Sequence, residues 1–171
     1  AYLLNKHDIL DFKYFFLVAA LAVTLVSLDT IFQYIFGFNI IGLKNHSQPG
    51  VETLTAFNLR NSGFFGDEYI GGGYIQRFAF FAIFSAILLF KNNNYTKFIF
   101  PPVIICVSGA GILFAGNRMS IILFIFGLLL VFLFNHKIRK IMFISLIALS
   151  ISLKFIISSN EDLKYRFHIF F

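Results

Sequence analysis

Three arginines have the side-chain chemistry to bind a phosphate group. Arg60 and Arg77 flank the segment NSGFFGDEYIGGGYIQ, and Arg118 lies in the short stretch AGNRMS. A guanidinium is always charged and pairs bidentately with phosphate oxygens. No one of these arginines is specific, so the prediction of an anionic ligand depends on all three lying on one face of the molecule. The alternative is three unrelated arginines at a membrane interface, where Arg77 extends its head group outward along apolar surface.

The segment between the first two arginines adds carboxylates and glycines. Asp67 and Glu68 are the acids available as a catalytic base. Glycine permits positive φ and lets backbone amides approach a ligand closely. Gly66, Gly71 and Gly72 are therefore candidates to support a ligand-binding loop. The dinucleotide fingerprint GxGxxG is absent. A flexible re-entrant turn is the alternative interpretation of this segment.

Asp29 and Gln33 form a further polar pair within an apolar segment. They are four residues apart and therefore share one face of a helix. An ionisable residue inside a membrane is costly and faces the protein interior, which marks it as a functional candidate. The alternative, which we favour at this point, is a structural hydrogen bond or a polar helix end at the level of the lipid headgroups.

The composition indicates a membrane protein. Of the 171 residues, 58% are apolar and 13% are charged, whereas soluble domains average about 45–50% and about 25%. The apolar residues form five long runs, which predict an all-α, polytopic helical bundle with spans at 14–36, 73–90, 98–115, 119–134 and 141–157. Residues 1–171 are expected to form a single membrane domain, and the missing initiator Met suggests a fragment of a longer protein.

Basic residues predict the orientation of these spans. Lys and Arg are concentrated in the N-terminal tail and in the connections KNNNYTK (91–97) and NHKIRK (135–140), which the positive-inside rule assigns to the cytoplasm. The long loop 37–72, the turn around Arg118 and the tail 158–171 then face outward. All three arginines consequently lie on the outer face. A lipid-linked diphosphate suits this location, because its head lies at the interface and its tail enters the bilayer.

The charge distribution argues against other partners and cofactors. A net charge of +6 would suggest nucleic acid in a soluble protein, but here the basic residues flank apolar runs, where anionic membrane lipids account for them. The histidines are scattered over both sides without metal-ligand spacing, and no phosphate-binding P-loop is present, so neither a metal nor a cofactor is expected. They are His7, His46, His136 and His168.

Three stretches, in this order, resemble the O-antigen polymerase and O-antigen ligase superfamily of bacterial inner-membrane glycosyltransferases. They are SLDTIFQYIFGFNIIG (27–42), RNSGFFGDEYIGGGYIQRF (60–78) and AGNRMS (115–120). The resemblance implies a metal-independent, inverting enzyme of the multi-spanning C type. Such an enzyme moves a glycan from undecaprenyl diphosphate to an acceptor, a glycan or lipid A-core, on the periplasmic face. The family arginines that bind the diphosphate would correspond to Arg60, Arg77 and Arg118.

The sequence does not assign the catalytic base to one residue. The resemblance implicates, for ligases, a histidine in a large periplasmic loop that would begin within 158–171, but His168 is not in a recognisable version of that motif. Asp67 and Glu68 remain the candidate bases, and polymerase and ligase are not separated. One competing hypothesis is a flippase for polyprenyl-linked glycans, or another membrane transporter, which predicts internal repeats and broken helices near the midplane. A non-catalytic membrane scaffold is the other.

Overall fold

Five α-helices make up most of the chain that the computed structural model describes, namely residues 12–43, 61–66, 68–89, 94–136 and 138–159. They are α2 (Phe12–Phe36), α3 (Gly71–Leu89), α4 (Asn94–Phe114), α5 (Arg118–Phe134) and α6 (Arg139–Ser158), with a 3-10 turn η1 (Gly63–Phe65) before α3. No strand occurs within those ranges. The all-α prediction is confirmed, and each predicted apolar segment coincides with one helix.

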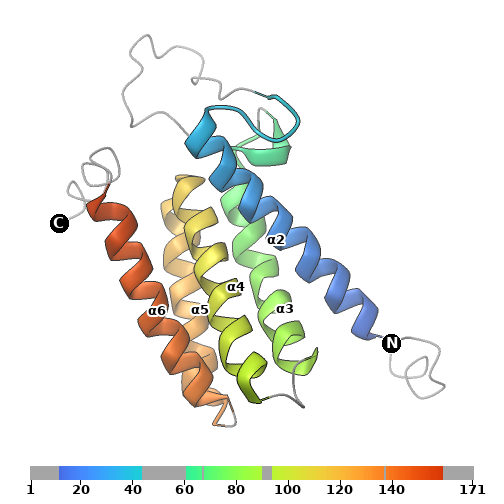
Figure 1. The fold of residues 1–171 in the computed structure, drawn as a ribbon, viewed down its shortest axis with the longest axis vertical. Coiled ribbons are helices and arrows are strands. Elements are labelled where there is room, and N and C mark those ends of the chain that lie inside the picture. Colours follow the sequence, from blue (N-terminus) through green and yellow to red (C-terminus); the bar gives the residue numbers. More distant parts are fainter. Residues whose placement is uncertain (1–11, 44–60, 67, 90–93, 137, 160–171) are drawn as a thin grey trace.

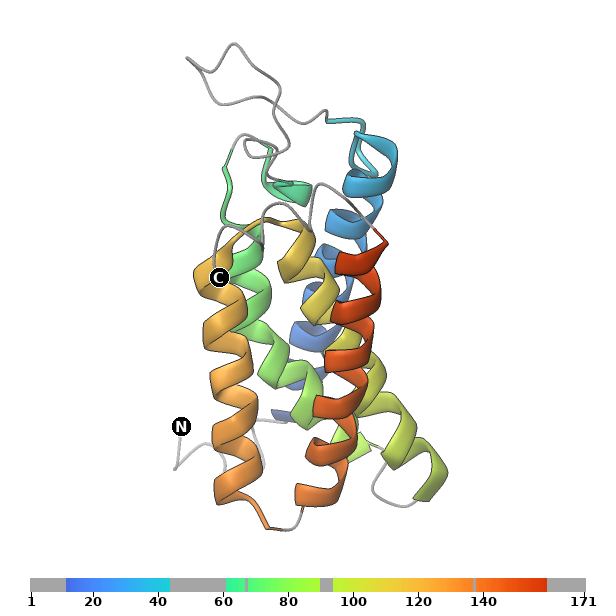
Figure 2. The same cartoon turned by 90° about the vertical axis from the view of Figure 1, so that its left-hand side faces the viewer.

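Successive helices run in opposite directions along the bundle (Figures 1 and 2). One end of the bundle, which we call the loop end, carries residues 37–43, η1, the start of α3, the turn 115–117 between α4 and α5, and the end of α6. α4 lies at the centre of the packing, in contact with α2, α3, α5 and α6. Arg77 and Arg118 therefore belong to the same half of the bundle, as the alternation of spans predicts.

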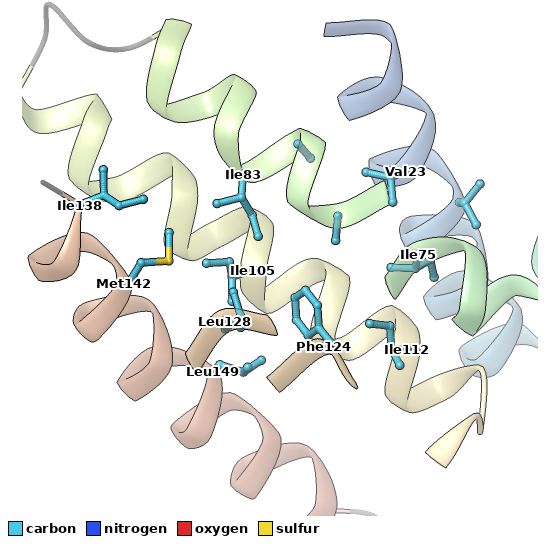
Figure 3. Close-up of a cluster of buried hydrophobic side chains, with 13 residues drawn as sticks. Val23, Ile75, Ile83, Ile105, Ile112, Phe124, Leu128, Ile138, Met142 and Leu149 are labelled. Atoms are coloured by element: carbon cyan, nitrogen blue, oxygen red, sulfur yellow. The ribbon is translucent and has the colours of Figure 1, made fainter. Parts of the chain in front are cut away.

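The core is apolar and closely packed where small residues allow the helices to approach. Its buried side chains come from every helix and include Val23, Ile75, Ile105, Ile112 and Phe124 (Figure 3). A Cβ added to Gly111 of α4 would lie 3.0 Å from both Cα and Cβ of Ser27 of α2. Helices that pack in lipid typically approach through such small residues.

Alongside the apolar core, the bundle interior contains hydroxyl groups, and much of the bundle exterior is apolar. Buried hydroxyls occupy the bundle interior, and those of Ser27, Thr30 and Ser145 each donate to the backbone carbonyl four residues earlier. Large apolar side chains cover the outside of the last two helices. They are Ile122, Leu123, Phe126, Leu129, Leu130 and Leu133 on α5, and Phe143, Ile144, Ile147, Ile151 and Phe155 on α6.

Two helices in the described part of the chain are long and apolar enough to cross a membrane, Tyr14–Phe36 and Arg139–Ser158. Phe98–Phe114 and Arg118–Phe134 are apolar but shorter. At the end opposite the loop end, Arg139 donates from Nε to the carbonyl of Phe132 (3.3 Å) and from Nη2 to that of Leu133 (3.1 Å). One basic residue of the NHKIRK connection thus satisfies carbonyls at the end of α5.

Candidate functional site at the loop end

Two side chains near the end of α2 hold the segments that follow it. Oδ1 of Asp29 accepts a hydrogen bond from the N–H of Ile40 (2.8 Å), and Oε1 of Gln33 accepts one from the N–H of Gly63 (2.7 Å). Both side chains are fully buried. The predicted common face of Asp29 and Gln33 is confirmed, and it is directed into the protein rather than toward the outside.

Asn39 and Asn61 complete this arrangement, and the sequence analysis missed both. Nδ2 of Asn39 donates to the carbonyl of Gly63 (2.9 Å), while its Oδ1 accepts from the N–H groups of Ile41 (3.1 Å) and Leu43 (2.7 Å). Nδ2 of Asn61 donates to the carbonyl of Phe114 (2.6 Å), one of the carbonyls left without a partner at the end of α4. We call Asp29, Gln33, Asn39 and Asn61 the polar cluster. The only sequence signal for Asn39 is an asparagine two residues after the glycine that ends α2, a position that favours turns.

Two atoms of the polar cluster are buried without a hydrogen-bond partner among the described residues. They are Oδ2 of Asp29 and Nε2 of Gln33. A buried polar atom left in this way costs about 1–3 kcal/mol. The cluster therefore stabilises the loop end through its six bonds to backbone groups while retaining one acceptor and one donor close to Gly63.

The glycines of the loop are explained by protein packing. A Cβ on Gly71 would lie 3.1 Å from the carbonyl oxygen of Ser62. A Cβ on Gly72 would lie 2.9 Å from Cβ of Asn117 and 3.2 Å from Cβ of Ala115. Gly66 has φ near +60°, with only Leu43 at 3.9 Å from its added Cβ. The space beside Gly71 and Gly72 is thus filled by protein atoms, which brings the start of α3 against the α4–α5 turn.

Arg77 lies on the edge of α3 that borders α5. It follows Gly73 by four residues and precedes Phe80 by three, so the three share one side of the helix. An added Cβ on Gly73 would lie 4.0 Å from Oγ of Ser120, and the ring of Phe80 packs on Phe124 with centroids 5.8 Å apart. The Arg77 side chain itself is exposed.

Arg118 is the first residue of α5 and is half-buried. The preceding Asn117 caps the helix, since its Oδ1 accepts from the N–H of Ser120 (3.4 Å). Because Gly72 packs on Asn117, the starts of α3 and α5 lie side by side, with Arg118 at the start of α5 and Arg77 six residues after the start of α3.

The remaining predicted residues are partly described. The Glu68 side chain is exposed at the loop end, and its backbone N–H donates to the carbonyl of Phe65 (3.1 Å). Arg60 and Asp67 lie outside the described residues. Within the described ranges, no three or more His, Cys, Asp or Glu side chains come together as a metal site would require.

At the loop end, the described part of the chain therefore combines a buried polar cluster with two arginines and one carboxylate carried on adjacent elements. Comparison with protein-family models, with curated proteins and with solved structures finds no match to this chain.

Proposed function

We propose that this chain is the donor-binding part of a bacterial inner-membrane glycosyltransferase that polymerises or ligates a glycan linked to undecaprenyl diphosphate. All five helices would cross the bilayer as a polytopic bundle, with the loop end on the periplasmic side. The observation that carries the proposal is that Arg118, at the start of α5, and Arg77, in the first half of α3, lie on helices whose starts are adjacent, in the same half of a bundle with an apolar exterior.

The exterior of the bundle supports the membrane part of the proposal. Soluble monomers rarely expose contiguous apolar patches larger than a few hundred Å², whereas α5 and α6 expose large apolar side chains from end to end. The shortest helix, α5, has 17 residues, which is the lower limit of about 17–25 residues for a span. An apolar exterior that extends along whole helices is what lipid, and not water, favours.

The loop end supports the ligand class. A diphosphate carries several anionic oxygens, and an arginine can bind two of them at once. Arg77 and Arg118 are two such donors. Arg60 is a third candidate on the basis of the sequence, and it directly precedes Asn61, whose side chain bonds to the end of α4. The acceptor is a glycan or lipid A-core hydroxyl.

The transfer itself needs a nucleophile, a base and a stabilised leaving group. The acceptor oxygen forms a bond to the anomeric carbon as the bond from that carbon to the diphosphate oxygen breaks, and the configuration inverts. The hydroxyl proton passes to a base, for which the exposed Glu68 and, by sequence, Asp67 are the candidates. The arginines stabilise the charge that develops on the departing diphosphate.

The arginines provide the test. We expect Arg77→Ala and Arg118→Ala each to lower the amount of polymerised or ligated surface glycan about tenfold, because each removes a charge-assisted contact to the leaving group. Lys140→Ala, at an exposed basic residue of the opposite end, is the matched control and leaves the glycan unchanged. Loss of single-unit export instead of transfer supports a flippase, and normal glycan in both arginine variants supports a scaffold; either result excludes the transferase.

Orientation is tested separately by cysteine labelling. In a Cys106→Ser background, which lacks other cysteines, a cysteine placed at exposed Ile41 is expected to react with a membrane-impermeant maleimide in intact spheroplasts. A cysteine at exposed Asn135, in the turn at the other end, reacts only after the membrane is permeabilised. Labelling of both sites from the outside contradicts the polytopic arrangement.

A further inference from the structure

A row of aromatic rings follows the contact between α2 and α3, starting at the loop end. Phe65 of η1 lies against Tyr74 of α3, with ring centroids 5.3 Å apart, and Tyr74 lies against Phe78 at 4.7 Å. Phe78 continues to Phe81 at 5.9 Å, and Phe81 to Phe16 of α2 at 5.7 Å. All four distances fall in the range in which aromatic rings attract one another. We call these five rings the aromatic ladder.

The ladder lies at the edge of the core, on which Phe65, Tyr74 and Phe78 pack, and its last ring on α3 is about halfway along that helix. Each of its rings is half-buried, so each keeps an outward-facing part. Tyr74, Phe78 and Phe81 are spaced by four and three residues and share one face of α3. Phe81 lies ten residues after the start of α3 at Gly71, a distance of about 15 Å. That is half of the roughly 30 Å hydrocarbon core, the depth of one leaflet.

The positively charged Arg77 lies beside the part of the ladder that is nearest the loop end. Arg77 follows Tyr74 by three residues and precedes Phe81 by four, so it adjoins the ladder on the α3 surface. Side chains of a helix lean toward its N-terminus, and the N-terminus of α3 is at the loop end. The guanidinium is thereby directed toward the headgroup level while the rings line the hydrocarbon below it.

We propose that the aromatic ladder binds the isoprenoid chain of the lipid-linked donor, with the donor's diphosphate on Arg77. This inference rests on the proposed function and adds to it the place of the donor's tail. From Phe65 to Phe78 the ladder is one ring wide, and Phe15 lies beside its last two rings, 5.7 Å from Phe16 and 6.1 Å from Phe81. A narrow row of this kind matches one linear chain with regularly spaced methyl branches, which can contact the faces and edges of successive rings. A phospholipid brings two chains to one phosphate and fits a narrow row less well.

Direct binding to the chain in nanodiscs tests the proposal, with three probes. These are geranylgeranyl diphosphate, inorganic diphosphate and the anionic phospholipid phosphatidic acid. We expect the double variant Phe78→Leu, Phe81→Leu to bind geranylgeranyl diphosphate about five- to tenfold more weakly, since two ring contacts are lost. Binding of inorganic diphosphate stays unchanged, and phosphatidic acid competes poorly. The matched control is Phe126→Leu on α5, whose ring is 55% exposed and lies away from the ladder; it leaves all binding unchanged.

Equal weakening in the Phe126→Leu control overturns the proposal, and so does full competition by phosphatidic acid, because either would make the ladder ordinary lipid-facing surface. If Arg77→Ala abolishes binding of geranylgeranyl diphosphate while the double variant binds it normally, the ladder is excluded as the binding site of the isoprenoid chain. The proposed function stands in that case. If the unaltered chain binds no polyprenyl diphosphate, the proposed function fails as well. Should the double variant unfold, Phe16→Leu replaces it, because that ring belongs to the ladder and lies 5.7 Å from Phe81; weakening of about twofold is then expected, and unchanged binding overturns the proposal.

Discussion

Replacement of Gly111 by alanine is expected to lower the free energy of unfolding by about 2–3 kcal/mol. The new methyl group would lie 3.0 Å from Cα and Cβ of Ser27. Neither atom can rotate away, because one belongs to the backbone of α2 and the other is fixed to it. α2 and α4 must therefore separate, which loosens the packing around Ile75 and the polar cluster at the end of α2. Denaturant or thermal unfolding in detergent measures the loss.

Gly109 provides the control within the same helix. A methyl group there would come even closer to a neighbour, Cδ1 of Leu149, but this atom is the end of a flexible side chain that can change rotamer. Alanine also favours a helix interior over glycine by about 1 kcal/mol, at both positions. We expect Gly109→Ala to be nearly neutral. If the two variants lose equal stability, the close approach of α2 and α4 at Ser27 is not what limits position 111.

The helices could be predicted from the sequence because the apolar runs are long and separated by short polar connections. The boundaries are less certain for local reasons. α4 begins at Asn94, four residues before the predicted start, since the polar end of the KNNNYTK connection joins the helix. Pro101 and Pro102 lie inside α4 and do not end it. α3 begins directly at Gly71, in a run of three glycines that resembles a loop.

The polar cluster shows the limit of prediction from spacing. The common face of Asp29 and Gln33 follows from helix geometry, but their partners do not. Gln33 bonds to Gly63, which is 30 residues away, and Asn61 bonds to Phe114, which is 53 residues away. Such pairs arise only when the bundle places two helix ends next to one another. The same holds for the arginines. Alternation of spans predicts that Arg77 and Arg118 lie in the same half of the bundle, but it does not predict that α3 and α5 are neighbours there, which depends on the packing of Gly72 against Asn117.

Gly63 is the position at which these long-range contacts meet, and its replacement by alanine is expected to lower the free energy of unfolding by about 3 kcal/mol. Its φ of +61° is unfavourable for alanine. The added Cβ would also lie 3.0 Å from Oγ1 of Thr30 and 3.2 Å from Oδ2 of Asp29. Moving Gly63 away from these atoms weakens the bonds that its N–H and carbonyl form with Gln33 and Asn39. Unfolding in detergent, as for Gly111, gives the size of the effect.

Gly37→Ala separates the two causes of this loss. Gly37 has a similar positive φ of +79°, but nothing lies within 4 Å of its added Cβ. It therefore carries the backbone strain without the crowding, and a loss of about 1 kcal/mol is expected. A loss as large at Gly37 as at Gly63 would show that Thr30 and Asp29 do not restrict position 63. A cysteine that replaces the buried Ser62 is expected to react with maleimide in the Gly63→Ala variant and to stay protected in the Gly37→Ala variant. That labelling would mean that the polar cluster, and not the turn alone, fixes residues 61–66.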